Sequence, residues 1–162
     1  MTIIKPSKKP LQTLHPIPPL ILTIIVGAVM LVSKMFLGVS VISVPYASTI
    51  TMLLIIIGGI PFTGAVYLFI KARTTVNPTQ PDASSSLVTH GIYRFTRNPM
   101  YLGFLLWLMA WGIYLEEIVA ISGPLFFYWY INRYQIPFEE AALNKHFSDT
   151  YVTYYNTTRR WL

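Results

Sequence analysis

Two polar stretches, well separated along the 162-residue chain, carry the side chains that could do chemistry. The stretch 90–101 holds a histidine, two arginines, two tyrosines and an Asn-Pro pair, and the stretch 133–140 holds an arginine, a glutamine and two adjacent glutamates. Carboxylates bind cationic groups through charge-assisted contacts, and tyrosine rings cover apolar and π surfaces. The chain has no cysteine and only three histidines, so a thiolate nucleophile is excluded and no metal site is expected. These two stretches are the candidate functional segments.

The composition predicts the class of protein that positions them. Apolar residues make up 54% of the chain and charged residues only 11%, whereas a soluble domain usually carries about 25% charged residues. A chain of this size has too few charges to keep its surface in water, and its hydrophobicity is too high for a disordered protein. We therefore expect an all-α integral membrane protein and exclude a soluble globular enzyme.

Four stretches without charge predict about four transmembrane helices, at residues 10–33, 49–70, 98–115 and 118–132. A spanning helix needs roughly 20 apolar residues, and lipid forces backbone polar groups to pair within the segment. The last two stretches are separated only by Glu116 and Glu117, which predicts a tight helical hairpin with a solvated acidic turn. We expect a single membrane domain over 1–162, divided as follows: two N-terminal spans in 1–71, a linker and motif in 72–97, the hairpin in 98–133 and an interfacial tail in 134–162.

The basic residues predict the orientation of this domain. Eleven of the twelve Lys and Arg residues fall before the first span, between the second and third, or after the fourth, and only Lys34 falls on the other side. By the positive-inside rule both termini and the active site are expected in the cytoplasm. The net charge of +6 is then explained by topology, and no nucleic-acid partner is expected. The hairpin brings the two polar stretches to the same membrane face.

The order of motifs over residues 85–162 resembles the isoprenylcysteine carboxyl methyltransferase and phospholipid methyltransferase superfamily of membrane enzymes. Its members carry a segment like 87–93, then an Arg-Asn-Pro-Met-Tyr-Leu-Gly run like 97–103, a helical hairpin, a glutamate pair like 139–140 and an Arg-Trp pair near the C-terminus like 160–161. The first half of the chain matches the superfamily only as generic spans. The resemblance implies transfer of a methyl group from S-adenosylmethionine to a lipophilic acceptor associated with the bilayer.

The resemblance also implies which residues form the site. The residues implied for cofactor binding are Leu87, Val88, His90, Tyr93, Asn98, Pro99, Met100, Tyr101, Glu139 and Glu140, and those implied for catalysis and acceptor binding are Glu139, Arg133 and Gln135. In the isoprenylcysteine enzymes an arginine four residues before the cofactor glutamate serves the substrate. Gln135 stands at that position here, with Arg133 nearby, so the sequence predicts an acceptor other than a prenylcysteine carboxylate.

Two other functions remain open from the sequence. An NADPH-dependent membrane reductase of the sterol-reductase kind has a similar C-terminal half, although no extra basic cluster for the nicotinamide 2′-phosphate is present. A non-catalytic membrane interaction protein could keep the same scaffold. For single residues, Arg94 and Arg97 are equally explained as positive-inside anchors, and Glu140 as a carboxylate exposed near a helix start.

Overall fold

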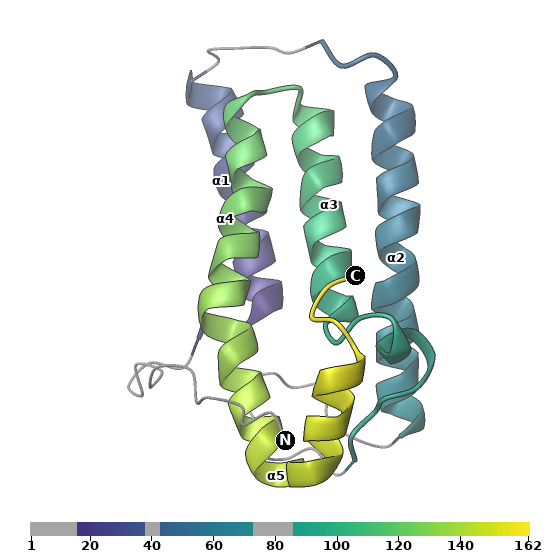
Figure 1. Ribbon diagram of the computed structural model, residues 1–162. Coiled ribbons are helices and arrows are strands. Elements are labelled where there is room, and N and C mark those ends of the chain that lie inside the picture. The colour runs from purple at the N-terminus through teal and green to yellow at the C-terminus, as the bar shows by residue number, and fades with distance from the viewer. Residues whose placement is uncertain (1–15, 38–42, 73–85) are drawn as a thin grey trace.

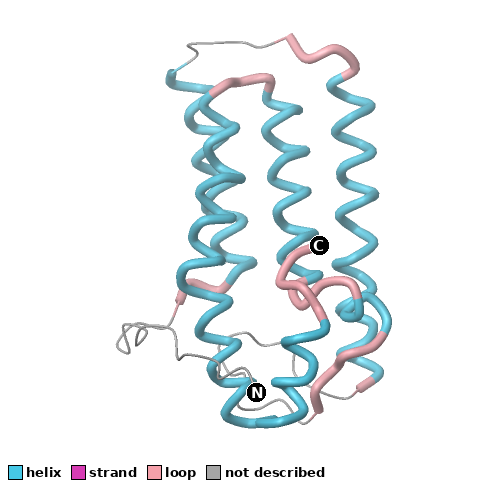
Figure 2. The backbone as a smooth tube through the Cα atoms, in the orientation of Figure 1, coloured by secondary structure: helices cyan, strands magenta, loops and turns pink. Residues whose placement is uncertain are grey.

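The computed structural model describes residues 16–37, 43–72 and 86–162, and these residues form helices and connecting turns without a β-strand (Figure 2). In chain order the elements are α1 (Pro19–Leu37), α2 (Ala47–Lys71), the 3-10 helix η2 (Gly91–Arg94), α3 (Pro99–Leu115), the 3-10 helix η3 (Val119–Ile121), α4 (Ser122–Tyr130), the π-helix η4 (Ile131–Gln135) and α5 (Ile136–Thr157). The all-helical class is confirmed. The basic N-terminal segment and most of the linker expected within 72–97 lie outside the described residues.

Helices α1 and α2 are long and apolar enough to cross a membrane. Only 22% of the most apolar stretch of α1 and 17% of that of α2 are buried inside the protein. Their outward side chains are large and hydrophobic, as at Ile24 (62% exposed), Val29 (63%) and Ile60 (62%). A soluble protein would bury such a surface, so these faces fit the hydrocarbon of a bilayer. The chain is a membrane protein. The 17-residue α3 is apolar but shorter, and the expected total of four spans stays a prediction.

The helices run side by side, with α3 packed against α1, α2 and α4 (Figure 1). Helices α2 and α3 approach closely because glycines face each other: a Cβ on Gly103 would lie 2.8 Å from the backbone oxygen of Gly58. Small residues commonly allow this backbone contact in membranes. The Trp107 indole donates to the carbonyl of Ile55 at 3.1 Å, and that of Trp111 to the carbonyl of Gly27 at 3.0 Å. Helix α3 is thereby fixed to both neighbours.

The turn between α3 and α4 differs from the expected solvated acidic turn. Glu116 ends α3 in the left-handed conformation (φ 51), and Glu117 is only 3% exposed. The Ser33 hydroxyl at the end of α1 donates to Glu117 Oε2 at 3.0 Å. The expectation of a solvated Glu117 was wrong, because α1 covers this turn.

The C-terminal region folds back toward the start of α3. Helices α4, η4 and α5 follow one another without a gap, and α5 bends at Ser148, whose φ of 41 and ψ of −116 are not helical. After this bend the chain returns alongside η2 and the first turn of α3 (Figure 1). The return places residues 151–161 against the motif at 90–101.

Candidate active site

The first part of the site is the chain entering α3. Gly91 has a φ of 62, a conformation that suits glycine, and a Cβ there would lie 2.8 Å from a methyl carbon of Leu68 on α2. This turn packs η2 against α2, where the ring of Tyr93 meets that of Phe69 edge to face at 5.5 Å. Pro99 then occupies the first turn of α3, where its missing N–H costs no helical hydrogen bond. The Asn-Pro pair therefore fixes where α3 begins.

The second part is the glutamate-bearing start of α5. The π-helix η4 precedes α5 and leaves Gln135 buried, with 1% of its surface exposed. Gln135 and Glu139 are four residues apart and face each other, and Gln135 Nε2 donates to Glu139 Oε1 at 2.6 Å. The Tyr101 hydroxyl on α3 donates to the same oxygen. These three side chains join α3 to α5 at the centre of the site.

Burial raises the pKa of the Glu139 carboxyl from 4.5 to about 7. Hydrogen bonds from Tyr101 and Gln135 oppose that rise, and the nearby charge of Glu140 adds to it. No lysine, arginine or histidine among the described residues forms an ion pair with Glu139. Near neutral pH this carboxyl is thus poised to ionise when a cation approaches.

An apolar and aromatic cluster adjoins this carboxyl. Its buried members are Ala65, Val88, Tyr93, Tyr151 and Tyr154, with Leu87 and Met100 among the partly buried side chains packed against them. The Tyr154 hydroxyl donates to the carbonyl of Tyr93 at 2.8 Å. Burial, together with the Tyr154 and Glu139 charges, holds the pKa of Tyr93 well above 10, so this phenol stays protonated. The cluster offers surface to a ligand and no nucleophile.

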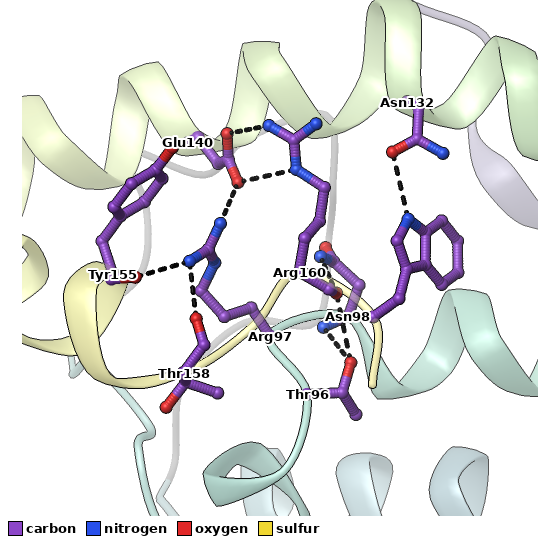
Figure 3. A network of polar contacts seen from close by, with 9 residues as sticks. Thr96, Arg97, Asn98, Asn132, Glu140, Tyr155, Thr158 and Arg160 are labelled. Carbon is purple, nitrogen blue, oxygen red and sulfur yellow. Dashed lines mark hydrogen bonds and ion pairs between the residues drawn. The ribbon is translucent and has the colours of Figure 1, made fainter. Parts of the chain in front are cut away.

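Glu140 has different partners from its neighbour (Figure 3). Arg97 NH2 lies 2.9 Å from Glu140 Oε1, and Arg160 NH2 lies 2.6 Å from Oε2. The other Arg97 nitrogen, NH1, donates to the carbonyls of Tyr155 and Thr158 at 2.7 Å each, and the guanidinium lies 4.0 Å from the centre of the Tyr155 ring. Glu140 is therefore committed to a network that joins α5, the C-terminal tail and the segment before α3.

Further hydrogen bonds attach the C-terminal tail to the motif. Asn98 Nδ2 donates to the carbonyl of Arg160 at 2.8 Å, and the hydroxyl of the fully buried Thr96 donates to the same carbonyl at 3.2 Å. The Trp161 indole donates to Asn132 Oδ1 at 3.0 Å (Figure 3). The tail is thus attached both to the motif and to η4.

The chain matches the phospholipid methyltransferase family over residues 46–150, which is more than half of its length. The chain belongs to this family. Protein-S-isoprenylcysteine O-methyltransferase A of Arabidopsis thaliana is 30% identical over 67% of this chain and 55% of that protein. The protein-S-isoprenylcysteine O-methyltransferase of Saccharomyces cerevisiae is 29% identical over 64% of this chain and 44% of that protein. An uncharacterized protein of Haemophilus influenzae is 43% identical over 39% of this chain and 100% of that protein.

These matches show the family of this chain but not the roles of its individual residues. The chain spans about half the length of the isoprenylcysteine methyltransferases described above. No solved structure matches it. The resemblance to the superfamily is confirmed at the level of the family, whereas the site residues have to be judged by where the fold places them.

The fold brings most of the sequence-predicted residues of this family member together. Gln135, Glu139 and Tyr101 form one hydrogen-bonded group, and the residues of the adjoining cluster are Leu87, Val88, Tyr93 and Met100. Asn98 and Glu140 belong to the network around Arg160, and Pro99 is buried at the start of α3. His90 and Arg133 are exposed, and the Arg133 guanidinium lies 5.7 Å from the centre of the Tyr134 ring. The roles expected for these two residues stay predictions.

Arg160 and Thr96 belong to the polar network beside the site, a role that the sequence alone did not assign. Their contact depends on the return of the chain after Ser148, so it joins positions about sixty residues apart, from the Thr96 hydroxyl to the Arg160 carbonyl. The Arg-Trp pair at 160–161 was the available signal, since it belongs to the family resemblance. The resemblance gives the position of this pair in the chain but not the residues that it contacts.

Proposed function

We propose that this protein transfers a methyl group from S-adenosylmethionine to a lipophilic acceptor in the membrane, in the manner of the isoprenylcysteine methyltransferases it resembles. The observation that carries the proposal is the partly buried Glu139 carboxyl, which has hydrogen-bond donors in Tyr101 and Gln135 but no cationic partner among the described residues. This carboxyl lies where the family motifs converge. Family membership favours this function over that of a sterol-type reductase.

The residues present fit S-adenosylmethionine, which supplies an electrophilic methyl group on a sulfonium centre. A carboxylate without a cationic partner gains a charge-assisted contact from the sulfonium or the amino group of the cofactor. The apolar and aromatic surface of Val88, Tyr93 and Met100 suits its adenosine part. Glu140 is engaged with Arg97 and Arg160, so we assign Glu139 rather than Glu140 to the cofactor.

The chain's own part in such a reaction is to position two reactants and to exclude water. Methyl transfer is an in-line displacement, for which correct placement supplies much of the rate. Tyr101 and Gln135 hold the Glu139 carboxyl from two different helices, so this carboxyl would hold the cationic end of the cofactor in a defined position. The tail at 158–161 is hydrogen-bonded to Asn98 at the start of α3 and to Asn132 in η4, which holds these segments together.

The membrane arrangement that goes with this function has four spans, with α3 and α4 as a hairpin and the site in the cytoplasm beside both termini. The lipid-facing surfaces of α1 and α2 and the strong asymmetry of the basic residues support it. A lipophilic acceptor would then enter the site sideways from the bilayer. That route gives a reason for building a small methylation site into a membrane.

The nature of the acceptor follows from Gln135. Its neutral amide is buried and donates to Glu139, while Arg133 points to the ring of Tyr134 at the surface. A neutral hydrogen bond contributes about 1 kcal/mol, against about 1.5–3 kcal/mol for a contact to a charged group. We therefore expect a neutral or amine-bearing lipophilic acceptor to be preferred over a prenylcysteine carboxylate.

Calorimetry on the purified full chain in detergent tests the proposal, with S-adenosylmethionine and NADPH as separate ligands. We expect binding of S-adenosylmethionine only, and incorporation of its labelled methyl group into a membrane lipid extract. Binding of NADPH, or of neither ligand, would overturn the proposed function. Rapid methyl ester formation on a farnesylcysteine analogue would instead overturn only the acceptor preference.

A further inference from the structure

A groove of 480 Å³ lies between α3 and α4, in the half of the bundle away from the candidate active site. Its size falls within the range of about 300–1,000 Å³ that ligand pockets occupy. The apolar side chains that line it include Leu105, Met109, Ile113, Pro124, Leu125 and Tyr128. Glu116 and Glu117, which follow the end of α3, also line the groove.

The acidic end of this groove contains an unsatisfied polar atom. Glu117 is 3% exposed, and its Oε2 accepts from Ser33, but its Oε1 is buried without a partner among the described residues. Burying an acceptor without a hydrogen bond costs on the order of 1–3 kcal/mol, and more for a charged group. Glu116 Oε1 accepts from the backbone N–H of Val44, and neither glutamate belongs to an ion pair within the described part of the chain. The groove therefore ends in two carboxyl groups that form no ion pair with any described residue.

The two carboxyl groups at the end of the groove favour a ligand with a positively charged hydrogen-bond donor. A primary ammonium group supplies both the positive charge and the N–H donors that Glu117 Oε1 lacks. A quaternary ammonium carries the charge but has no N–H to donate, and an anionic headgroup is repelled. The apolar walls next to this end suit a hydrocarbon chain, and the exposed face of Leu125 (66%) places the groove open to the surrounding lipid.

We propose that this groove binds a bilayer phospholipid with a primary ammonium headgroup, which contacts Glu117 while one acyl chain lies between α3 and α4. The site is separate from the candidate active site. Tyr101 lies near the start of α3 and Glu117 follows its end, and the fourteen helical rises of 1.5 Å from Tyr101 to Leu115 alone separate the two by roughly 20 Å. The lipid held here is not the methyl acceptor, and the proposal does not depend on the proposed function.

Native mass spectrometry of the full chain, released from detergent with added dioleoyl lipids, tests the proposal. The three probes are phosphatidylethanolamine, phosphatidylcholine and phosphatidylglycerol, which share their acyl chains and differ in the headgroup. We expect bound phosphatidylethanolamine to exceed either of the others by about threefold or more, because only its headgroup offers a charged donor. Glu117→Gln, which keeps an acceptor for Ser33 and removes the charge, should bring that ratio to about one.

Two further variants keep the test decisive. Leu125→Trp fills the groove from an exposed position and should lower phosphatidylethanolamine occupancy even if Glu117→Gln fails to fold. Asp149→Asn removes an exposed carboxyl on α5 outside the groove and should leave the ratio unchanged. Equal occupancy by the three lipids would overturn the proposal. So would a preference that survives both Glu117→Gln and Leu125→Trp, or a dimer that binds no lipid.

Discussion

Glu139 and Glu140 are neighbours in the chain, but their side chains lie in opposite electrostatic surroundings. Glu140 contacts two guanidinium groups, whereas Glu139 contacts a phenol and an amide and no cation among the described residues. Burial destabilises the charged form of Glu139, whereas two ion pairs hold the Glu140 side chain in place. One carboxylate therefore belongs to the structure of the protein and the other is available to a ligand.

The raised pKa of Glu139 predicts a pH dependence of stability. A carboxyl whose pKa is about 7 in the folded state and 4.5 otherwise binds its proton more tightly when folded. Its contribution is fully present below pH 4.5 and is lost as the pH rises through about 7. The free energy of unfolding, measured by denaturant titration in detergent, should therefore fall over this window in the wild type relative to Glu139→Gln. Parallel curves for the two proteins would show that Glu139 titrates normally.

Binding of S-adenosylmethionine should show the opposite dependence on pH. The ionised carboxylate is the form that holds a cation, so affinity should rise as the pH passes through about 7. At pH 8 we expect Glu139→Gln to weaken binding by about ten- to a hundredfold, which corresponds to about 1.5–3 kcal/mol for a charge-assisted contact. Calorimetry gives both quantities. The matched control is Asp149→Asn on the exposed face of α5; an equal loss there would place the cofactor elsewhere.

At the scale of the elements, the sequence located the helix whose two ends carry local signals and missed where the next helix ends. The expected span 98–115 corresponds closely to α3, because Pro99 begins the helix and Glu116 ends it. The expected span 118–132 instead continues through η4 into α5. Pro137 does not stop the helix, since it lies in the first turn of α5, directly after the register change of the π-helix. No periodicity in the sequence predicts such a π-helix.

The sequence could predict which residues belong to the candidate site, but not the different contacts that Glu139 and Glu140 make there. The resemblance identified Glu139 and Tyr101, and the fold places them in contact. The partners of Glu140 depend on the return of the chain after Ser148, which is a tertiary event without a local signal. The sequence predicted only an interfacial tail over 134–162, and nothing in it predicts the bend that brings residues 151–161 to the motif.

The bend at Ser148 predicts unequal effects of two substitutions at one exposed position. Ser148 has a φ of 41, which glycine adopts without strain and β-branched residues strongly resist. Ser148→Gly should keep or raise the thermal midpoint, while Ser148→Val should lower it by about 2–4 °C for each kcal/mol of strain in a chain of this size. Thermal unfolding in detergent compares them directly. A Val variant as stable as the Gly variant would mean that α5 is straight at this point.

At the scale of the whole molecule, one ion-pair network ties three distant segments together. Arg97 precedes α3, Glu140 lies on α5 and Arg160 lies in the C-terminal tail. Glu140→Gln leaves two guanidinium groups without their shared carboxylate, of which the Arg97 side chain is only 9% exposed. Breaking a fully buried pair costs about 3–5 kcal/mol, so we expect a loss of about 2 kcal/mol for this partly exposed one.

Denaturant titration in detergent measures that loss of unfolding free energy, and Arg160→Gln is the variant for comparison. Arg160 is 33% exposed and should cost less than Glu140→Gln, because solvent screens it and Arg97 keeps its carboxylate. The double variant should fall short of the sum of the two single effects, since both remove the same contact. Strict additivity would indicate that the two residues do not interact.

The orientation of the whole molecule in the membrane gives the last prediction. The chain has no cysteine, so a single cysteine introduced at Tyr46, which is 82% exposed between α1 and α2, or at Asp149 on α5 is the only reactive thiol in each variant. Eleven of twelve basic residues predict that Tyr46 faces away from the cytoplasm and Asp149 into it. In intact cells an impermeant maleimide should label Tyr46→Cys directly and Asp149→Cys only after the membrane is opened. His90→Cys should behave like Asp149→Cys, because the hydrogen bond from Tyr154 on α5 to the carbonyl of Tyr93 in η2 holds these two elements at the same end of the bundle (Figure 1). Labelling of all three from one side would overturn the four-span arrangement, and with it the cytoplasmic supply of cofactor on which the proposed function depends.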